Sequence, residues 1–167
     1  MNKALFLDRD GVINIDKGHV YLRVQFEFMP GIFDLCRRYA FEGYLIIIVT
    51  NQAGIAKGIY TEKDFCDLTS WMLDRFSSEG VNISKVYHCP HHSENTGICG
   101  CRKPAPGMIL QAIIDFNLDI SQCVLIGDKE TDLEAGRRAG ILERNLVLVT
   151  QRSTEDPQSA TENYDSV

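Results

Sequence analysis

Acidic side chains are closely paired at two places in the chain. Asp8 and Asp10 are separated by one residue and precede Gly11, and Asp128 is followed four positions later by Asp132. Two carboxylates held close together either raise the pKa of one of them or require a cation. Mg²⁺ is the natural partner, because it takes oxygen ligands and bridges to phosphate groups. The sequence therefore predicts a magnesium site able to take a phosphorylated ligand.

A cysteine-rich segment at residues 89–101 offers a second set of metal ligands. Four of its side chains could bind one ion: Cys89, His91, Cys99 and Cys101. Three cysteines and one histidine are a common tetrahedral set for structural Zn²⁺, and such a closed site leaves no position open for chemistry. The C-x-H and C-x-C spacings leave a disulfide, ordinary loop residues, or His92 as the nitrogen ligand open as alternatives. The remaining cysteines are expected to fill the core: Cys36, Cys66 and Cys123.

Short apolar runs alternate with helical patterns along the chain, which is typical of a parallel α/β sheet. Strands are predicted at residues 4–7, 44–49, 85–88, 123–126 and 146–149. Asp8, Thr50 and Asp128 each lie just beyond the end of one of these strands. Because ligands bind at the carboxyl ends of the strands in an open α/β sheet, we expect the three side chains to meet at one edge. An Asp-Gly pair alone is common in loops, but three such strand ends together indicate a functional site.

Four motifs, taken in order, resemble those of the haloacid dehalogenase (HAD) superfamily. They are Asp8-x-Asp10-Gly11-Val12, Thr50-Asn51, Lys103 and Gly127-Asp128-x-x-x-Asp132. The resemblance spans residues 4–149 and implies a Rossmann-like α/β domain. This domain would have a central parallel sheet with helices on both faces, a minimal cap and a zinc-binding loop. The resemblance also implies phosphoryl transfer through an aspartyl-phosphate, since a covalent intermediate divides one difficult displacement into two easier ones.

The resemblance implies a role for each catalytic residue of these motifs. Asp8 would attack phosphorus as the nucleophile, and Asp10 would protonate the leaving oxygen and later activate water. Thr50 and the Asn51 backbone would donate hydrogen bonds to the phosphoryl oxygens, and Lys103 would add a fixed positive charge. The expected reaction is the hydrolysis of a phosphate monoester.

The resemblance also implies how Mg²⁺ is held. Its ligands would be the Asp8 carboxylate, the Asp10 backbone carbonyl and Asp128. Asp132 would orient Lys103 or a metal-bound water rather than bind the ion directly. Most lysines are solvated surface residues, but Lys103 stands in an Arg-Lys-Pro sequence directly after the cysteine-rich segment, which favours a place in the site.

Within the superfamily, the cysteine-rich segment narrows the resemblance to the histidinol-phosphatase-like group, whose ligand set selects His91. Zn²⁺ would then be structural and Mg²⁺ catalytic. Arg102, whose planar fork suits phosphate, and Gln52 would contact the substrate. Residues 14–27 would form a flap over it.

Several segments are similar in more detail to one kind of enzyme within that group. They include residues 8–14, 50–58, 89–92 and 101–104. This similarity implies that the substrate is heptose 1,7-bisphosphate, hydrolysed at its C7 phosphate in the synthesis of ADP- or GDP-heptose for surface polysaccharide. Histidinol phosphate and a broader range of sugar phosphates are the alternatives.

The whole chain, with 167 residues of which 44% are hydrophobic, suits a single globular domain. We expect that domain at residues 1–152, followed by a polar tail at 153–167. The net charge of −6 and the lack of a basic cluster argue against nucleic acid and anionic membranes as partners. No apolar run suits a signal peptide or a membrane span, which favours the cytoplasm. No predicted helix has a long apolar face beyond the one that the core requires, so we expect a monomer. We expect its partner to be a small phosphorylated metabolite.

Two other classes of protein fit the sequence less well than a phosphatase. A dinucleotide-binding enzyme would carry Gly-x-Gly-x-x-Gly after its first strand, and this chain has no such motif there. A non-catalytic, zinc-dependent module that binds a phosphorylated ligand would usually lack one of the acidic motif residues. None of these residues is missing here, which favours the enzyme.

Overall fold

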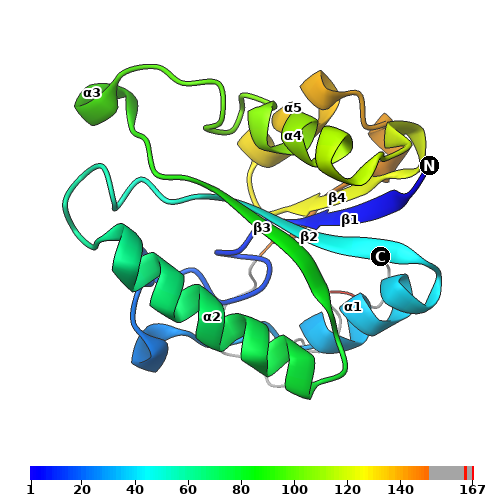
Figure 1. Ribbon diagram of the computed structural model, residues 1–167, viewed down its shortest axis with the longest axis horizontal. Coiled ribbons are helices and arrows are strands. Elements are labelled where there is room, and N and C mark those ends of the chain that lie inside the picture. Colours follow the sequence, from blue (N-terminus) through cyan, green and yellow to red (C-terminus); the bar gives the residue numbers. More distant parts are fainter. Residues whose placement is uncertain (151–163, 165–166) are drawn as a thin grey trace.

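The computed structural model describes residues 1–150, 164 and 167 of the chain (Figure 1). In this part of the chain one sheet is formed by β1 (Lys3–Leu7), β2 (Tyr44–Asn51), β3 (Ile83–Cys89), β4 (Val124–Gly127) and β5 (Leu146–Leu148). All neighbouring strands are parallel, and they lie in the order β3-β2-β1-β4-β5. The strand order reverses between β1 and β4, which is where sheets of this kind bind ligands. The expected parallel α/β sheet is confirmed.

Helices cover both faces of this sheet (Figure 1). They are α1 (Ile32–Phe41), α2 (Glu62–Ser78), α3 (Ser93–Thr96), α4 (Gly107–Phe116) and α5 (Glu130–Ala139). α1 and α2 lie on one face and α4 and α5 on the other, while the short α3 belongs to the cysteine-rich segment. Short 3₁₀ segments occur in the connections: η1 (Arg23–Gln25), η2 (Ile120–Gln122) and η3 (Glu143–Asn145).

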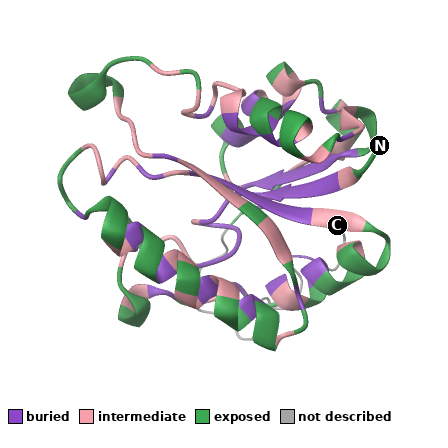
Figure 2. Ribbon diagram, in the orientation of Figure 1, coloured by how far each residue is buried: buried purple, intermediate pink, exposed green. Residues whose placement is uncertain are grey.

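Alternate side chains of the strands fill two apolar clusters, one on each face of the sheet. Leu5 and Leu7 of β1 belong to the cluster covered by α1 and α2. Ala4 and Phe6 belong to the cluster covered by α4 and α5. This division follows from the pleat of a strand, which turns successive side chains to opposite faces. Because both faces are covered, the central strands are almost wholly apolar, and Figure 2 shows them buried at the centre of the molecule.

The helix α2 begins with a capping box. The Thr61 hydroxyl accepts a hydrogen bond from the Asp64 N–H at 3.1 Å, and the Asp64 carboxylate accepts one from the Thr61 N–H at 2.8 Å. The apolar stripe that predicted this helix is buried: Phe65, Leu68, Met72 and Phe76. Of the cysteines expected in the core, Cys36 and Cys123 are buried. Cys66 is exposed, because it lies on the outer side of α2.

Near the end of the chain, Tyr164 packs into the domain. The predicted polar tail, 153–167, lies outside the described residues except for Tyr164 and Val167. The Tyr164 ring is 3% exposed and belongs to the apolar cluster beside α1. Its hydroxyl donates a hydrogen bond to the Val12 carbonyl, and Arg38 donates one to the Tyr164 carbonyl at 2.8 Å. Tyr164 thus connects the end of the chain to the loop that follows β1.

No further domain stands over the carboxyl edge of the sheet in the described residues. The connection from β1 to β2 holds η1 and α1, and the connection from β2 to β3 holds α2. This agrees with the small cap that the sequence led us to expect. None of the helices in this part of the chain is long and apolar enough to cross a membrane.

Candidate active site

The carboxyl ends of β1 and β2 and the start of α5 surround a cavity of about 420 Å³. Among the residues that line it are most of those singled out in the sequence: Asp8, Asp10, Asn51, Gln52, Arg102, Lys103 and Asp132. Thr50 is fully buried behind this lining, and its hydroxyl is hydrogen-bonded to Gln52. Asp128 follows β4, and its carboxyl group interacts with that of Asp8. The structure therefore brings together the acidic, hydroxyl and lysine side chains that the strand ends predicted.

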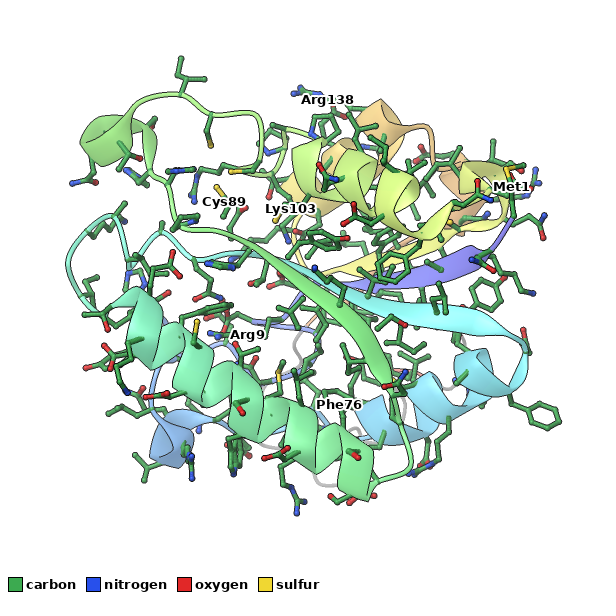
Figure 3. All side chains as sticks on the ribbon, in the orientation of Figure 1. Met1, Arg9, Phe76, Cys89, Lys103 and Arg138 are labelled. Carbon is green, nitrogen blue, oxygen red and sulfur yellow. The ribbon has the colours of Figure 1, made fainter. Side chains whose placement is uncertain are left out.

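Lys103 joins the expected nucleophile to the second acidic pair. Its ammonium nitrogen lies 2.8 Å from Asp8 Oδ1 and 2.6 Å from Asp132 Oδ1. It also donates a hydrogen bond to the Val49 carbonyl at 2.8 Å. Lys103 is only 4% exposed, so its charge is buried and fully paired (Figure 3). These contacts leave Lys103 beside the atom that would attack phosphorus.

Asp132 is engaged at both of its oxygens. Oδ1 meets Lys103, and Oδ2 accepts hydrogen bonds from the backbone N–H groups of Asp128 and Lys129 at 3.2 and 3.1 Å. These backbone groups belong to the turn between β4 and α5, near the positive end of the helix. Gly127 allows this approach, because a Cβ there would lie 2.3 Å from the Asp132 Cβ. Asp132 therefore contacts Lys103 as the sequence led us to expect.

Burial and crowding shift the pKa values of these groups. Burial raises the pKa of the Asp8 carboxyl; Lys103 opposes this shift, and the Asp132 carboxylate adds to it. Burial likewise raises the pKa of Asp128. Burial would lower the pKa of Lys103, but Asp8 and Asp132 outweigh that effect and raise it. The site thus holds more negative charge than Lys103 alone neutralises.

This excess of carboxylate oxygen suits a divalent cation. One carboxylate oxygen from each of Asp8, Asp128 and Asp132 lies within 4.8 Å of the other two. Asp128 Oδ1 is buried and has no hydrogen-bond partner among the described residues. Mg²⁺ takes oxygen ligands, and a buried carboxylate without a partner is stabilised by a bound cation. Because both Asp132 oxygens are already engaged, Asp8 and Asp128 are the better placed ligands.

The Asp10 carboxylate is held by three donors. Oδ1 accepts hydrogen bonds from Arg9 Nη2 and Asn14 Nδ2, both at 3.0 Å, and Oδ2 accepts one from Gln52 Nε2 at 3.1 Å. Arg9 is 2% exposed and also donates to the Val20 carbonyl at 2.7 Å, which ties the following loop to the site (Figure 3). Both oxygens of the Asp10 carboxylate are therefore fixed, and Asp10 lines the same cavity as Asp8.

Asn51 connects the end of β2 to the Lys103 loop. Its side-chain amide donates to the Lys103 carbonyl at 3.1 Å and accepts from the Lys103 N–H at 3.0 Å. The expected contact of the Asn51 backbone with phosphate stays a prediction. The observed contact gives the side chain a different task, which is to fix the backbone that carries the lysine.

Gln52 makes contacts that the sequence did not suggest. Its expected contact with the sugar stays a prediction. Gln52 lines the cavity, although it is only 2% exposed and its amide is engaged within the protein. Nε2 donates to Asp10 Oδ2 and, at 2.9 Å, to Thr50 Oγ1, while Oε1 accepts from the Tyr60 hydroxyl. The Thr50 hydroxyl thus accepts from Gln52 and donates to the Asn51 carbonyl at 3.5 Å.

The cysteine-rich segment gathers four ligand atoms. Cys89, His91, Cys99 and Cys101 each place one ligand atom within 4.8 Å of the other three. His91 Nδ1 lies 3.6 Å from Cys89 Sγ and 3.3 Å from Cys101 Sγ. Cys99 Sγ lies 3.6 Å from Cys89 Sγ and 3.5 Å from Cys101 Sγ. The Cys89 and Cys101 sulfurs are closer to each other, at 2.8 Å. Ligands about 2.0–2.3 Å from a tetrahedral Zn²⁺ are separated by distances close to most of these.

This cluster is fastened to the active site at both ends. Cys89 ends β3, and its carbonyl accepts a hydrogen bond from the Gln52 N–H at 2.8 Å. Cys101 is followed at once by Arg102 and Lys103, which line the cavity. The Arg102 guanidinium donates a hydrogen bond to the His91 carbonyl at 3.4 Å, and its expected contact with substrate stays a prediction.

Arg9 and Tyr60 were not singled out in the sequence, although both line the cavity. Arg9 lies between the two motif aspartates, and its side chain gave no separate signal. Tyr60 directly precedes Thr61, the N-cap of α2, so in the sequence it gives no signal beyond the start of that helix. His19 and Lys129 also line the cavity and add nearby positive or titratable groups.

Comparison with known proteins gives consistent matches. The HAD-hydrolase-like family model matches residues 100–166. D-glycero-alpha-D-manno-heptose-1,7-bisphosphate 7-phosphatase of Campylobacter jejuni is 49% identical over 153 residues, covering 92% of this chain and 86% of that protein. D-glycero-beta-D-manno-heptose-1,7-bisphosphate 7-phosphatase of Pasteurella multocida is 44% identical over 160 residues, covering 93% and 87%.

Solved structures agree with these sequence matches. A putative HAD-like phosphatase from Mesorhizobium loti superposes with a TM-score of 0.81 at 27% identity, covering 99% of this chain and 87% of that one. D,D-heptose 1,7-bisphosphate phosphatase from B. bronchiseptica, complexed with magnesium and phosphate, gives a TM-score of 0.76 at 28% identity, covering 83% and 76%. The relatives thus share the fold over most of their length.

Proposed function

The chain belongs to the heptose-1,7-bisphosphate 7-phosphatase family of HAD-like hydrolases, and we propose that it removes the C7 phosphate of D-glycero-D-manno-heptose 1,7-bisphosphate. The observation that carries this proposal is Asp8 beside Lys103, with the Asp10 carboxyl held next to it. The names of the relatives supply the substrate. The product would enter the synthesis of nucleotide-activated heptose for surface polysaccharide.

In the first half-reaction, an Asp8 carboxylate oxygen forms a bond to phosphorus while the bond from phosphorus to the C7 oxygen breaks. Asp10 gives its proton to the departing C7 oxygen, which leaves as an alcohol. In the second half, Asp10 takes a proton from water as that water attacks the aspartyl-phosphate. Inorganic phosphate departs and the Asp8 carboxylate is restored.

Phosphate recognition falls to the groups around Asp8. The Lys103 ammonium, 2.8 Å from the nucleophile, offsets the charge of the phosphoryl oxygens, and the Thr50 hydroxyl donates to one of them. Arg102, which lines the cavity, would bind substrate oxygens with its planar fork. These roles require the lysine to stay protonated, as its two carboxylate partners favour.

Mg²⁺ would be held by the Asp8 carboxylate, the Asp10 carbonyl and Asp128. When bound, it neutralises charge on the phosphoryl oxygens and orients the group for displacement. Zn²⁺ would be held by Cys89, His91, Cys99 and Cys101 and would be structural, because the four protein ligands close its coordination. The reduced cysteines of this cluster suit a reducing compartment, so we also propose a cytoplasmic enzyme. As the sequence led us to expect, we propose that it works as a monomer.

The test is phosphate release, with Mg²⁺, from both anomers of heptose 1,7-bisphosphate, from histidinol phosphate and from several sugar phosphates. The relatives carry both the alpha and the beta name, so both anomers are needed. We expect preference for a heptose bisphosphate, lost in Asp8→Asn. Preference for histidinol phosphate would change the substrate and keep the mechanism. Binding of these compounds without turnover by the wild type would instead indicate a non-catalytic module.

A further inference from the structure

The side-chain amide of Gln52 links three polar groups beneath the cavity. Nε2 donates to Asp10 Oδ2 at 3.1 Å and to Thr50 Oγ1 at 2.9 Å, and Oε1 accepts from the Tyr60 hydroxyl. The NH₂ group is favoured beside the ionised Asp10 carboxylate, because an amide oxygen there would place two acceptors together. The Oε1 atom must then face Tyr60, and a hydroxyl donor at that position locks the amide in this orientation.

Tyr60 itself is held by two neighbours. Its ring lies against the backbone of Gly54, where a Cβ would come within 2.1 Å of the ring carbon Cε1. The ring also stacks on Tyr21, with centroids 5.2 Å apart and planes 10° apart. Burial raises the Tyr60 pKa to about 12, so the hydroxyl keeps its proton and remains a donor. The hydroxyl is therefore a fixed donor aimed at Gln52.

We propose that Tyr60, acting through Gln52, is a positioning residue that holds the Asp10 carboxyl in place for proton transfer to the leaving oxygen. The inference rests on the proposed phosphatase reaction and adds residues to it. Arg9 and Asn14 hold the other Asp10 oxygen, so Gln52 supplies the remaining constraint. Without the Tyr60 hydroxyl the Gln52 amide can rotate, and Asp10 then loses its donor at Oδ2.

Leaving groups of different acidity separate this role from a general structural one. A sugar alkoxide needs a proton as the bond from phosphorus to oxygen breaks, and Asp10 supplies it. p-Nitrophenolate is stable without that proton, so p-nitrophenyl phosphate depends little on Asp10 for the same step. The value of kcat/KM reports the steps through formation of the aspartyl-phosphate, which is where the two substrates differ.

The experiment compares Tyr60→Phe with the wild type on heptose 1,7-bisphosphate and on p-nitrophenyl phosphate. The substitution removes the hydroxyl and retains the ring that stacks on Tyr21. We expect kcat/KM to fall about 10-fold for the sugar phosphate, a part of the ~10²–10⁴-fold contribution of a general acid, and less than about 2-fold for the aryl phosphate. The matched control is Tyr87→Phe, which removes a tyrosine hydroxyl bonded to Asp115 at 2.6 Å on the exposed surface.

The outcomes are distinct. An equal loss on both substrates, or no loss on either, would overturn the positioning role while the phosphatase proposal stands. Hydrolysis of neither substrate by the wild-type protein would overturn the phosphatase proposal and this inference with it. A loss confined to the sugar phosphate, with the control unchanged, supports the inference.

A double-mutant cycle tests whether the route runs through Gln52. Gln52→Leu removes both the donor to Asp10 and the acceptor for Tyr60 at similar volume. If Tyr60 acts only through this amide, adding Tyr60→Phe to Gln52→Leu leaves the ratio of the two kcat/KM values unchanged. A further drop in that ratio would overturn the route.

Discussion

Lys103 is a buried cation shared by two carboxylates that do not have equal tasks. In the proposed mechanism Asp8 attacks phosphorus, whereas Asp132 is anchored by two backbone N–H groups and contacts the lysine. An ion pair buried in this way is costly to break from one side only, because the remaining charge is left without a partner. We therefore expect Asp132 to orient Lys103 and Asp128 to bind the metal.

Asparagine substitutions at the two aspartates should show this difference. Asp132→Asn replaces the carboxylate beside Lys103 with a neutral amide. We expect kcat/KM to fall about 10²-fold. The Mg²⁺ concentration that gives half-maximal activity should change little. Asp128→Asn should raise that Mg²⁺ concentration at least about 10-fold. The measurement is activity as a function of Mg²⁺ for both variants. Equal weakening of Mg²⁺ binding by the two substitutions would make Asp132 a ligand.

Tyr60 should make the stability of the protein sensitive to alkaline pH. Its pKa is about 12 in the folded state and about 10 in an unfolded chain. The unfolded state therefore loses its proton first, so the contribution is fully present below pH ~10 and is lost as pH rises toward ~12. We expect the melting temperature to fall over this range, and to fall less steeply in Tyr60→Phe. Parallel curves for the two proteins would contradict this.

The cysteine-rich segment connects a candidate zinc site to the residues that line the cavity. Cys101 directly precedes Arg102 and Lys103, and Cys89 is joined to Gln52 through the backbone. We expect a zinc-selective chelator, with Mg²⁺ kept in excess, to lower the melting temperature and reduce kcat/KM at least about 10-fold, because second-sphere order around a site commonly carries that much. Restored Zn²⁺ should return both. An active, zinc-free protein with an unchanged melting curve would rule out a structural metal here.

How much the sequence predicts differs between elements and contacts. The strands were predictable because runs such as 44–49 are apolar on both faces, and the strand-end positions of Asp8, Thr50 and Asp128 followed from them. The contact of Tyr60 with Gln52 was not predictable, because it depends on the path of the loop between β2 and α2. A motif gives the place of Gln52 along the chain but not the direction of its amide.

At the scale of the whole molecule, the apolar cluster beside α1 includes a residue that is distant in sequence from the rest of the cluster. Tyr164 lies in the cluster beside α1 and bonds to Val12, 152 positions earlier in the chain. Val12 follows the Asp8–Gly11 turn, whose backbone is also held by the Arg9 carbonyl, which accepts from the Val12 N–H at 3.2 Å. The end of the chain therefore supports the loop that carries the nucleophile, although its composition is polar.

Removing the Tyr164 side chain should show how much of the fold depends on this contact. Truncating a buried aromatic ring commonly costs about 3–5 kcal/mol, so we expect Tyr164→Ala to lower the free energy of unfolding by about that much. Tyr164→Phe keeps the ring and leaves the buried Val12 carbonyl without its donor, which should cost about 1–3 kcal/mol. Tyr87→Phe, whose hydroxyl bond is exposed, should cost less than either. Denaturant unfolding gives all three values, and a Tyr164→Ala protein as stable as the wild type would mean that this ring does not pack into the domain in solution.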